Sequence, residues 1–516
     1  MFRFIGFVFI SFLFSLSANA QDTLMVKWGE EIKLSKDERY LDIVGSDENW
    51  FYTTKDLLGT KDKFILEKYS VDSLNRVFSK EVSLPEIDGE AMNFEKLVFA
   101  NNQFFLFASV YKNSTETISA YCTSMNTNGE WLDLPVLIDE FESKRWNSGE
   151  YDVMLSPDSS LFMVYHKLGF RKKSKDTFSF HVYSLSLDLL WEKRLELPAS
   201  SGAFEIDQYL LDNAGNVLLL SGMSPKKVDA DANRINTRKK EYILFTYSWA
   251  ENKLKEFNIN LKDKWVISAI CALTPEGNIC IGGFYSKDQY FTIGGSFFFT
   301  MNGQSREVTA SGLVVFDKEL LNEFLSGRQA EKGNELSDFY FDHLVIKPDG
   351  GAYMIAEQYY ISERITTDPN TGMRVVTYYY NYLDILVLKV TPDGQIEWSK
   401  KIPKDQSTAD DKGRYSSYAL FESEDQLYFL FNDHGDNLTL LLDEPSAELR
   451  SFSNSRKSVS TVVSVNERGE MNRSALFSFR ETGTILRPKL YRQLDSSSGV
   501  IYGQFKKTYR FGKLKF

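Results

Sequence analysis

Cysteine and histidine are scarce in this chain, with three cysteines and four histidines among 516 residues. No two histidines have the metal-binding H-x-x-x-H spacing, and no P-loop, G-x-S-x-G or G-x-G-x-x-G motif occurs. Asp342-His343 and Asp433-His434 each place a carboxylate beside an imidazole, but neighbouring side chains on a strand point in opposite directions. We therefore predict no metal site, no cofactor and no catalytic residue.

Positive charge and long apolar runs are also limited. Lysine and arginine number 60 against 71 acidic residues, which gives a net charge of −11. An acidic surface repels phosphate backbones and anionic headgroups, so neither nucleic acid nor an anionic membrane is expected as a partner. Aromatic residues make up 15% of the chain and hydrophobic residues 43%, which favours a large core and argues against disorder.

The one long apolar run lies at the N-terminus. Arg3 precedes an apolar stretch from Phe4 to Leu16, and the small residues Ser17–Ala20 follow it. This pattern predicts a signal peptide over residues 1–20 and an exported protein that is periplasmic, at the cell surface or secreted. An N-terminal membrane anchor is the alternative. No later run approaches the ~18 residues of a membrane span, so the mature chain is predicted to have no transmembrane segment.

Short apolar strands recur along the rest of the chain, and their starts are 54 to 74 residues apart. They are Asn49–Thr54, Gln103–Ser109, Leu161–His166, Asn216–Ser221, Asn278–Gly283, Ala352–Glu357, Gln426–Phe431 and Val500–Phe505. A repeat of this length with little helical periodicity indicates a β-propeller. Turns such as Lys347-Pro-Asp-Gly350 precede these strands, and further strands follow, which makes four antiparallel strands per unit.

The two ends of the chain complement each other. The last unit offers only three strands, at about Lys489–Asp495, Val500–Phe505 and Thr508–Phe516. The segment Leu24–Leu34 supplies one strand before the first full unit. We predict that this N-terminal strand completes the last unit and closes a single domain, residues 21–516, into a ring without an open sheet edge. The fold expected is an all-β, eight-bladed propeller, with seven blades as the alternative.

Two units carry insertions. Residues 284–337 contain a short amphipathic helix between Phe316 and Gly327, with Leu320, Leu321, Phe324 and Leu325 on one face and Gly327 as its C-cap. Residues 358–383 form a tyrosine-rich hairpin with Asp368–Gly372 at its tip. Both insertions are expected to decorate the faces of the ring.

Two of the three cysteines flank the turn Thr274-Pro-Glu-Gly277. A two-residue turn would place Cys271 and Cys280 opposite each other, where they could form a disulfide. A type I turn followed by a left-handed glycine would pair Thr274 with Asn278 and point the two thiols to opposite faces. The sequence favours the second register, and three buried free thiols.

The turn Thr391-Pro-Asp-Gly-Gln-Ile-Glu-Trp398 resembles the Asp-box of sialidase propellers, although its glycine comes one place early. The same combination of turn and tryptophan resembles the repeats of quinoprotein-type eight-bladed propellers. That resemblance implies that Trp131, Trp191 and Trp398 staple neighbouring blades. No adjacent cysteine pair accompanies it.

The hairpin tyrosines are the predicted binding residues, because tyrosine offers a broad apolar face and a hydroxyl at a low entropy cost. They are Tyr359, Tyr360, Tyr378, Tyr379, Tyr380 and Tyr382. The alternative is that alternate tyrosines only pack the hairpin onto its blade. We interpret the protein as a non-catalytic binding or scaffold propeller with a protein or glycan partner, of unspecified oligomeric state. The alternative function is a carbohydrate-active hydrolase or lyase, which would bring two carboxylates and an arginine or histidine together at the channel mouth.

Overall fold

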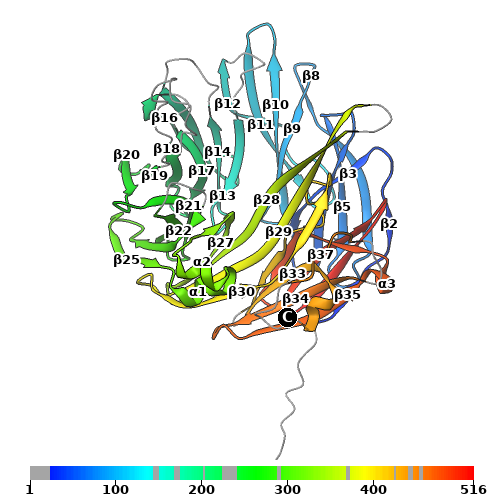
Figure 1. Ribbon diagram of the computed structural model, residues 1–516. Coiled ribbons are helices and arrows are strands. Elements are labelled where there is room, and N and C mark those ends of the chain that lie inside the picture. The colour runs from blue at the N-terminus through cyan, green and yellow to red at the C-terminus, as the bar shows by residue number, and fades with distance from the viewer. Residues whose placement is uncertain are drawn as a thin grey trace, which may run out of the picture.

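The chain folds almost entirely into antiparallel β-sheets, as a computed structural model of the protein shows (Figure 1). The structure describes residues 24–142, 150–167, 175–200, 204–223, 241–287, 292–367, 372–423, 426–439, 446–452 and 457–516. The predicted signal peptide lies outside these residues. Within them, eight antiparallel sheets have four or five strands each, and the first strands of most neighbouring sheets lie side by side. This is the arrangement of a β-propeller.

The first four sheets follow the order of the chain. They comprise β3 (Glu38–Ser46), β4 (Trp50–Leu57), β5 (Lys63–Ser70) and β6 (Arg76–Ser83); β9 (Asn93–Ala100), β10 (Gln103–Lys112), β11 (Thr117–Asn126) and β12 (Val136–Glu142); β13 (Glu150–Leu155), β14 (Leu161–Lys167), β15 (Lys175–Ser184) and β16 (Leu189–Ser200); and β17 (Phe204–Leu211), β18 (Val217–Met223), β19 (Glu241–Ser248) and β20 (Lys253–Ile259).

The second four sheets include the additions to the repeat. They comprise β21 (Trp265–Leu273), β22 (Ile279–Ser286), β24 (Gly295–Met301) and β25 (Val308–Val315); β27 (Phe339–Ile346), β28 (Ala352–Thr367), β29 (Arg374–Val390), β30 (Ile396–Ile402) and β31 (Gln406–Ala409); β32 (Ala419–Glu422), β33 (Gln426–His434), β34 (Ser458–Asn466) and β35 (Met471–Ser478); and β36 (Ile485–Asp495), β37 (Ser498–Phe505), β38 (Thr508–Lys515), β1 (Val26–Trp28) and β2 (Ile32–Lys33). Two small pairs, β7 (Glu86–Ile87) with β8 (Glu90–Ala91) and β23 (Thr292–Ile293) with β26 (Leu336–Ser337), lie outside them.

Every apolar segment aligned in the sequence becomes the second strand of a sheet, which confirms the repeat. The turn before β22 also has the predicted register. The Thr274 amide donates to the Asn278 carbonyl, and Gly277 has a φ of +82°. Cys271 therefore pairs with Ile281 rather than with Cys280, and the two thiols enter different hydrophobic clusters. All three cysteines are free and buried, as predicted.

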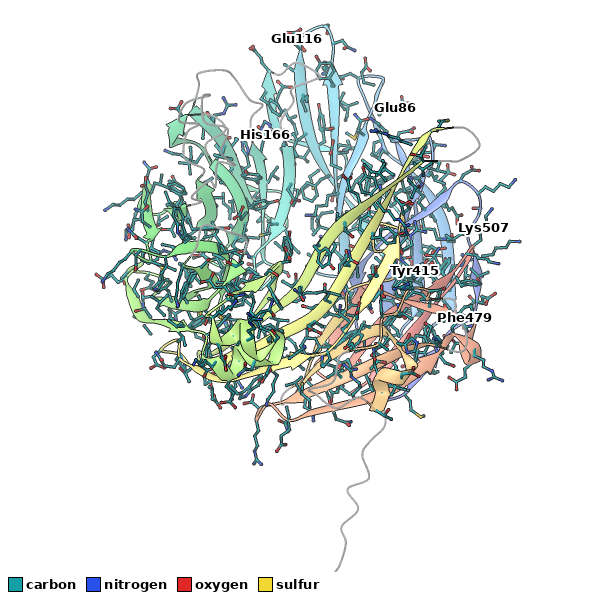
Figure 2. All side chains as sticks on the ribbon, viewed as in Figure 1. Glu86, Glu116, His166, Tyr415, Phe479 and Lys507 are labelled. Atoms are coloured by element: carbon teal, nitrogen blue, oxygen red, sulfur yellow. The ribbon has the colours of Figure 1, made fainter. Side chains whose placement is uncertain are left out.

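The core consists of layers between neighbouring sheets, which side chains fill (Figure 2). Of eight large hydrophobic clusters in the described chain, seven join two sheets that follow one another in the sequence, and the eighth joins the last sheet to the first. In that last-to-first cluster Phe51 of β4 packs against Phe511 of β38, with ring centroids 4.9 Å apart. Because each central strand supplies side chains to both of its neighbours, near-continuous apolar sequences suit these positions.

The N-terminal segment adds to the last sheet, in two short strands. β1 pairs antiparallel with β38 from Val26 opposite Leu514 to Trp28 opposite Gly512. β2 pairs with the other end of β38, where Ile32 faces Tyr509. Residues more than 480 positions apart in sequence thus belong to one sheet.

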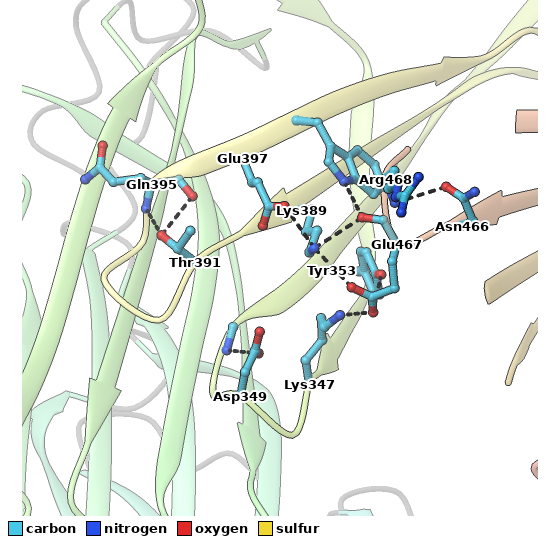
Figure 3. A network of polar contacts seen from close by, with 12 residues as sticks. Lys347, Asp349, Tyr353, Lys389, Thr391, Gln395, Glu397, Asn466, Glu467 and Arg468 are labelled. Atoms are coloured by element: carbon cyan, nitrogen blue, oxygen red, sulfur yellow. Dashed lines mark hydrogen bonds and ion pairs between the residues drawn. The ribbon is translucent and has the colours of Figure 1, made fainter. Parts of the chain in front are cut away.

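The resemblance to quinoprotein-type repeats implied that three tryptophans link neighbouring sheets. Two of them, Trp191 and Trp398, form such links. Trp191 Nε1 donates to the Gly215 carbonyl at 3.1 Å, and Trp398 Nε1 donates to the Glu467 carbonyl at 3.0 Å. The second contact is part of a network in which Lys347 and Lys389 both pair with the Glu467 carboxylate (Figure 3). The β34–β35 turn is therefore held by the preceding sheet.

The insertion after β25 contains two short helices rather than one. α1 (Lys318–Phe324) lies within the predicted range and buries Leu320 and Leu321. The predicted C-cap was wrong, because α1 ends at Leu325 and Gly327 begins α2 (Gly327–Glu331). A capping box between Ser326 and Gln329 starts the second helix there. A third helix, α3 (Phe479–Thr482), and a 3-10 turn at Gly435–Thr439 lie near the last two sheets.

Candidate functional site

The longest hairpin of the described chain extends beyond its own sheet (Figure 1). β27 pairs with β28 only as far as Gln358, and β30 pairs with β29 only as far as Ile385. Beyond these points, residues 359–367 and 374–382 continue as a two-stranded ribbon, which we call the ribbon. β31 pairs with its base, opposite residues 379–382. Residues 368–371, at the predicted tip, lie outside the described residues.

The ribbon is amphipathic, because residues directly opposite each other on antiparallel strands share a face. The pairs of one face are Tyr359 with Tyr382, Ile361 with Tyr380, Glu363 with Tyr378, Ile365 with Val376, and Thr367 with Arg374. The pairs of the other face are mostly polar: Tyr360 with Asn381, Ser362 with Tyr379, Arg364 with Thr377, and Thr366 with Val375. On the first, apolar face Ile361, Ile365 and Tyr378 are 52%, 56% and 45% exposed.

The six predicted tyrosines divide between these faces. Tyr359, Tyr378, Tyr380 and Tyr382 belong to the apolar face, whereas Tyr360 and Tyr379 belong to the polar one. Tyr359 and Tyr382 meet at the base with ring centroids 4.4 Å apart, and Tyr382 is buried. Tyr360 and Tyr378 are exposed, and Tyr379 and Tyr380 are half-buried beside β31. Within the predicted set, some tyrosines therefore pack at the base of the ribbon, and others are exposed to solvent.

An ion pair is buried beneath the base of the ribbon. Lys404 Nζ lies 2.8 Å from Glu357 Oε1, and both side chains are almost fully buried. The Ser417 hydroxyl donates to the other oxygen, Oε2, at 2.7 Å. Both oxygens of Glu357 are therefore engaged, so this carboxylate is a fixed structural charge.

A second carboxylate, Asp342, lies close to this pair. It occupies a bulge in β27, since the register with β28 shifts between Phe341 and His343. Its Oδ2 accepts a hydrogen bond from the buried Tyr418 hydroxyl at 3.1 Å. Although solvent reaches Asp342, loss of hydration and then the nearby negative Glu357 raise its pKa to about 7. This carboxyl group can exchange a proton near neutral pH.

A lysine from another sheet completes the base. Lys489 of β36 donates through Nζ to the Tyr382 hydroxyl at 2.9 Å, and its ammonium lies 4.6 Å from the Tyr382 ring centroid. The His343 ring lies 5.8 Å from that of Tyr418, and burial lowers the pKa of His343, which favours the neutral imidazole. The sheets around β27 and β36 thus bring acidic, basic and aromatic groups together.

The sequence draws attention to the tyrosines but not to Asp342, Glu357, Lys404 and Lys489, which lie beside them in the structure. The Asp342-His343 dipeptide is visible in the sequence, yet regular alternation gives no reason to select its carboxylate, because the bulge that displaces it leaves no local signal. No group of three or more His, Cys, Asp or Glu side chains in the described part of the chain is arranged to hold a metal ion. Among the same residues, no helix is long and apolar enough to cross a membrane.

No protein-family model matches this chain, and no curated protein is similar to it. Three solved propeller-type structures can be aligned over most of its length. The WD40 domain of SCAP from fission yeast is 8% identical, covers 96% of this chain and 94% of its own, and has a TM-score of 0.40. Polysaccharide lyase Uly1 is 10% identical with coverages of 95% and 99% and a TM-score of 0.39.

The third is quinohemoprotein alcohol dehydrogenase ADHIIG from Pseudomonas putida HK5, 8% identical, with coverages of 95% and 76% and a TM-score of 0.44. All three TM-scores are below 0.5, so the similarities carry no inference about what this chain binds or catalyses. The propeller assignment rests on the sheets and interfaces of the chain itself.

Proposed function

We propose that the protein is an exported, non-catalytic binding or scaffold propeller, whose ribbon docks a partner protein outside the cytoplasm. Export rests on the leader-like residues 1–20. We further propose eight blades closed into one ring by the N-terminal strands. Support for closure comes from the pairing of β1 and β2 with β38, and from the hydrophobic cluster shared by the last and first sheets.

The observation that carries the binding role is the exposed apolar face of the ribbon. Four large hydrophobic side chains of this face are exposed by 40% or more: Ile361, Ile365, Val376 and Tyr378. Contiguous exposed apolar surface of this kind marks interaction sites. Isoleucine and valine supply much of the face, and their lack of hydrogen-bonding groups favours a protein partner over a glycan.

The non-catalytic assignment follows from the state of the two carboxylates. Glu357 is held by Lys404 and Ser417, so it is not available to act together with Asp342 as a second acid or base. Most glycoside hydrolases use a pair of carboxyl groups that are free to share acid and base roles.

The test is affinity capture from envelope extract and culture medium, with the two faces of the ribbon compared. The first variant changes Ile361, Ile365 and Tyr378 to serine on the apolar face. Its matched control changes Ser362, Arg364 and Thr366 of β28 to alanine on the polar face of the ribbon. We expect a protein that is retained by the unmodified chain and the control and lost by the first variant. Loss from both variants, or from neither, would contradict docking through the apolar face.

A second candidate function is supported by Asp342 itself. A carboxyl group with a pKa of about 7 that accepts a hydrogen bond from Tyr418 has the properties of a general acid or base. The class expected is a carbohydrate-active hydrolase or lyase. Its test is release of reducing or unsaturated ends from polysaccharides; activity abolished by Asp342→Asn and retained by Tyr378→Ser would replace the binding role with an enzymatic one.

A further inference from the structure

A separate cavity of about 870 Å³ lies where the connections between first and second strands meet. The β3–β4, β9–β10 and β13–β14 turns contribute to its wall, together with Arg492 from β36. Its volume falls in the range of ~300–1,000 Å³ that small-molecule sites occupy. The ribbon joins a second strand to a third, and antiparallel neighbours place these two kinds of connection at opposite ends of a sheet. The cavity is therefore distinct from the ribbon.

Arg492 presents an unused edge of its guanidinium to this cavity. Its Nε donates to the Ser46 hydroxyl at 2.9 Å, which fixes the plane of the group. Within the described chain neither of its Nη atoms has a hydrogen-bond or ion-pair partner. Partial burial lowers the pKa of Arg492, against the opposing effect of the negative Asp42. A partly desolvated cation without a bound anion gains more from an incoming carboxylate than a hydrated one does.

Lys68 provides a second cation in the same wall. Its Nζ lies 4.7 Å from the centroid of the Trp50 ring and 5.8 Å from that of Tyr52, so two aromatic faces hold the ammonium in place. Of the described carboxylates, none forms an ion pair with it. The wall thus contains two cations, of which Arg492 is near Asp42 without forming an ion pair and Lys68 has no carboxylate partner among the described residues.

The remaining lining is suited to hydroxyl groups. Six amide or hydroxyl side chains face the cavity: Ser46, Asn49, Asn101, Asn102, Thr127 and Ser159. Of the two acidic residues, Asp47 accepts hydrogen bonds from the amides of Asn49 and Trp50 and from the Tyr52 hydroxyl, and Glu48 is exposed. Asparagine and serine bind sugar hydroxyls as donors and acceptors at once.

We propose that this cavity binds an acidic saccharide, with a uronate carboxylate on Arg492 and Lys68 and sugar hydroxyls on the surrounding amides. The guanidinium offers two parallel N–H donors to a carboxylate. Such a bidentate contact fixes the orientation of the bound carboxylate and also strengthens its binding. Asn101 and Asn102 then form hydrogen bonds with the hydroxyls of the adjoining sugar ring. This site is additional to the ribbon and does not depend on the ribbon's partner.

The test is calorimetric titration of the purified protein with tetramers of galacturonate and of mannuronate. The fully methyl-esterified tetragalacturonate, which keeps the hydroxyls but lacks the charge, serves as the ligand control. We expect at least one acidic tetramer to bind with a dissociation constant below about 1 mM, and its ester at least about tenfold more weakly. Absence of saturable binding by either acid overturns the proposal.

Three variants locate the site. Arg492→Gln and Lys68→Gln should each weaken binding by about tenfold or more, whereas Arg364→Gln on the ribbon should leave it unchanged. Because Lys68 makes no hydrogen bond to the fold, its variant keeps the test valid if Arg492→Gln fails to fold. Equal binding by the acid and its ester, undiminished binding by both cavity variants, or equally tight binding of a tetraglutamate peptide would each refute an acidic-saccharide site.

Discussion

Replacing Glu67 by glutamine should strongly destabilise the junction between the first and last sheets. Glu67 lies on β5 with its side chain fully buried, and its Oε1 is 2.8 Å from both Lys55 Nζ and Arg76 Nη1. Its Oε2 accepts hydrogen bonds from the hydroxyls of Tyr69 at 2.7 Å and Tyr509 at 3.1 Å. Since Tyr509 belongs to β38, this carboxylate ties the first sheet to the last.

The magnitude follows from the burial of the partners. Lys55 is 1% exposed, and without Glu67 it would retain only Glu38, at 3.1 Å. Breaking a buried ion pair from one side costs about 3–5 kcal/mol, because the remaining charge stays desolvated. That cost is a large part of the ~5–15 kcal/mol by which native proteins are stable. Urea unfolding of the purified protein and of Glu67→Gln at pH 7 measures the difference.

The same sheet provides a matched control. Glu81 pairs with Lys63 at 2.9 Å, but both side chains are largely exposed, so Glu81→Gln removes an ion pair without leaving a buried charge. We expect its unfolding midpoint to remain close to that of the unmodified protein. If Glu67→Gln unfolds at the same urea concentration as Glu81→Gln, the buried network does not stabilise the junction and our reasoning is wrong.

The dependence of stability on pH provides an independent test of the Glu67 network. Burial works to raise the pKa of Glu67, but Lys55 and the hydrogen-bond donors outweigh it and lower the pKa below its usual 4.5. A carboxylate with a depressed folded-state pKa adds stability above the unfolded-state pKa, and that stability is lost as the pH falls through the folded-state value. The difference between the unmodified protein and Glu67→Gln should therefore shrink below about pH 4.5.

Three further predictions concern other parts of the chain. Deleting Asp22–Leu34 removes β1 and β2, so the melting temperature should fall and aggregation increase; an unchanged melting curve would contradict closure by these strands. Because the pKa of Asp342 is raised to about 7, its ionisation opposes folding as the pH rises from about 4 to 7. Asp342→Asn should accordingly melt higher than the unmodified protein at pH 8 and equally at pH 4, and equal melting at both would count against the raised pKa. The three cysteines are buried and burial raises the pKa of each thiol, to about 11 for Cys280, so a thiol reagent should label them only after unfolding; labelling of the native protein would refute their burial.

Local patterns sufficed for the parts of the fold that depend on local geometry. Each second strand is a short apolar run behind a turn, because a sheet between two neighbours needs side chains on both faces. The register at Cys271 and Cys280 was predictable since the type of turn at Thr274 fixes which residues pair. The polar base of the ribbon was not predictable, because Asp342, Lys404 and Lys489 meet only through the packing of separate sheets.

The faces of the ribbon show why alternation alone fails at this candidate site. Counting by twos from the buried Ile385 along β29 leads to Tyr379, and would place Tyr378 and Tyr382 on the opposite face. In the structure the register shifts once: Glu357 faces Ile385, but Tyr359 faces Tyr382, so β29 contains one more residue than β28 in this interval. That single extra residue reverses the phase of the strand. It turns Tyr378 and Tyr382 toward the face of Tyr359, and thereby aligns the aromatic base with the exposed apolar residues beyond it.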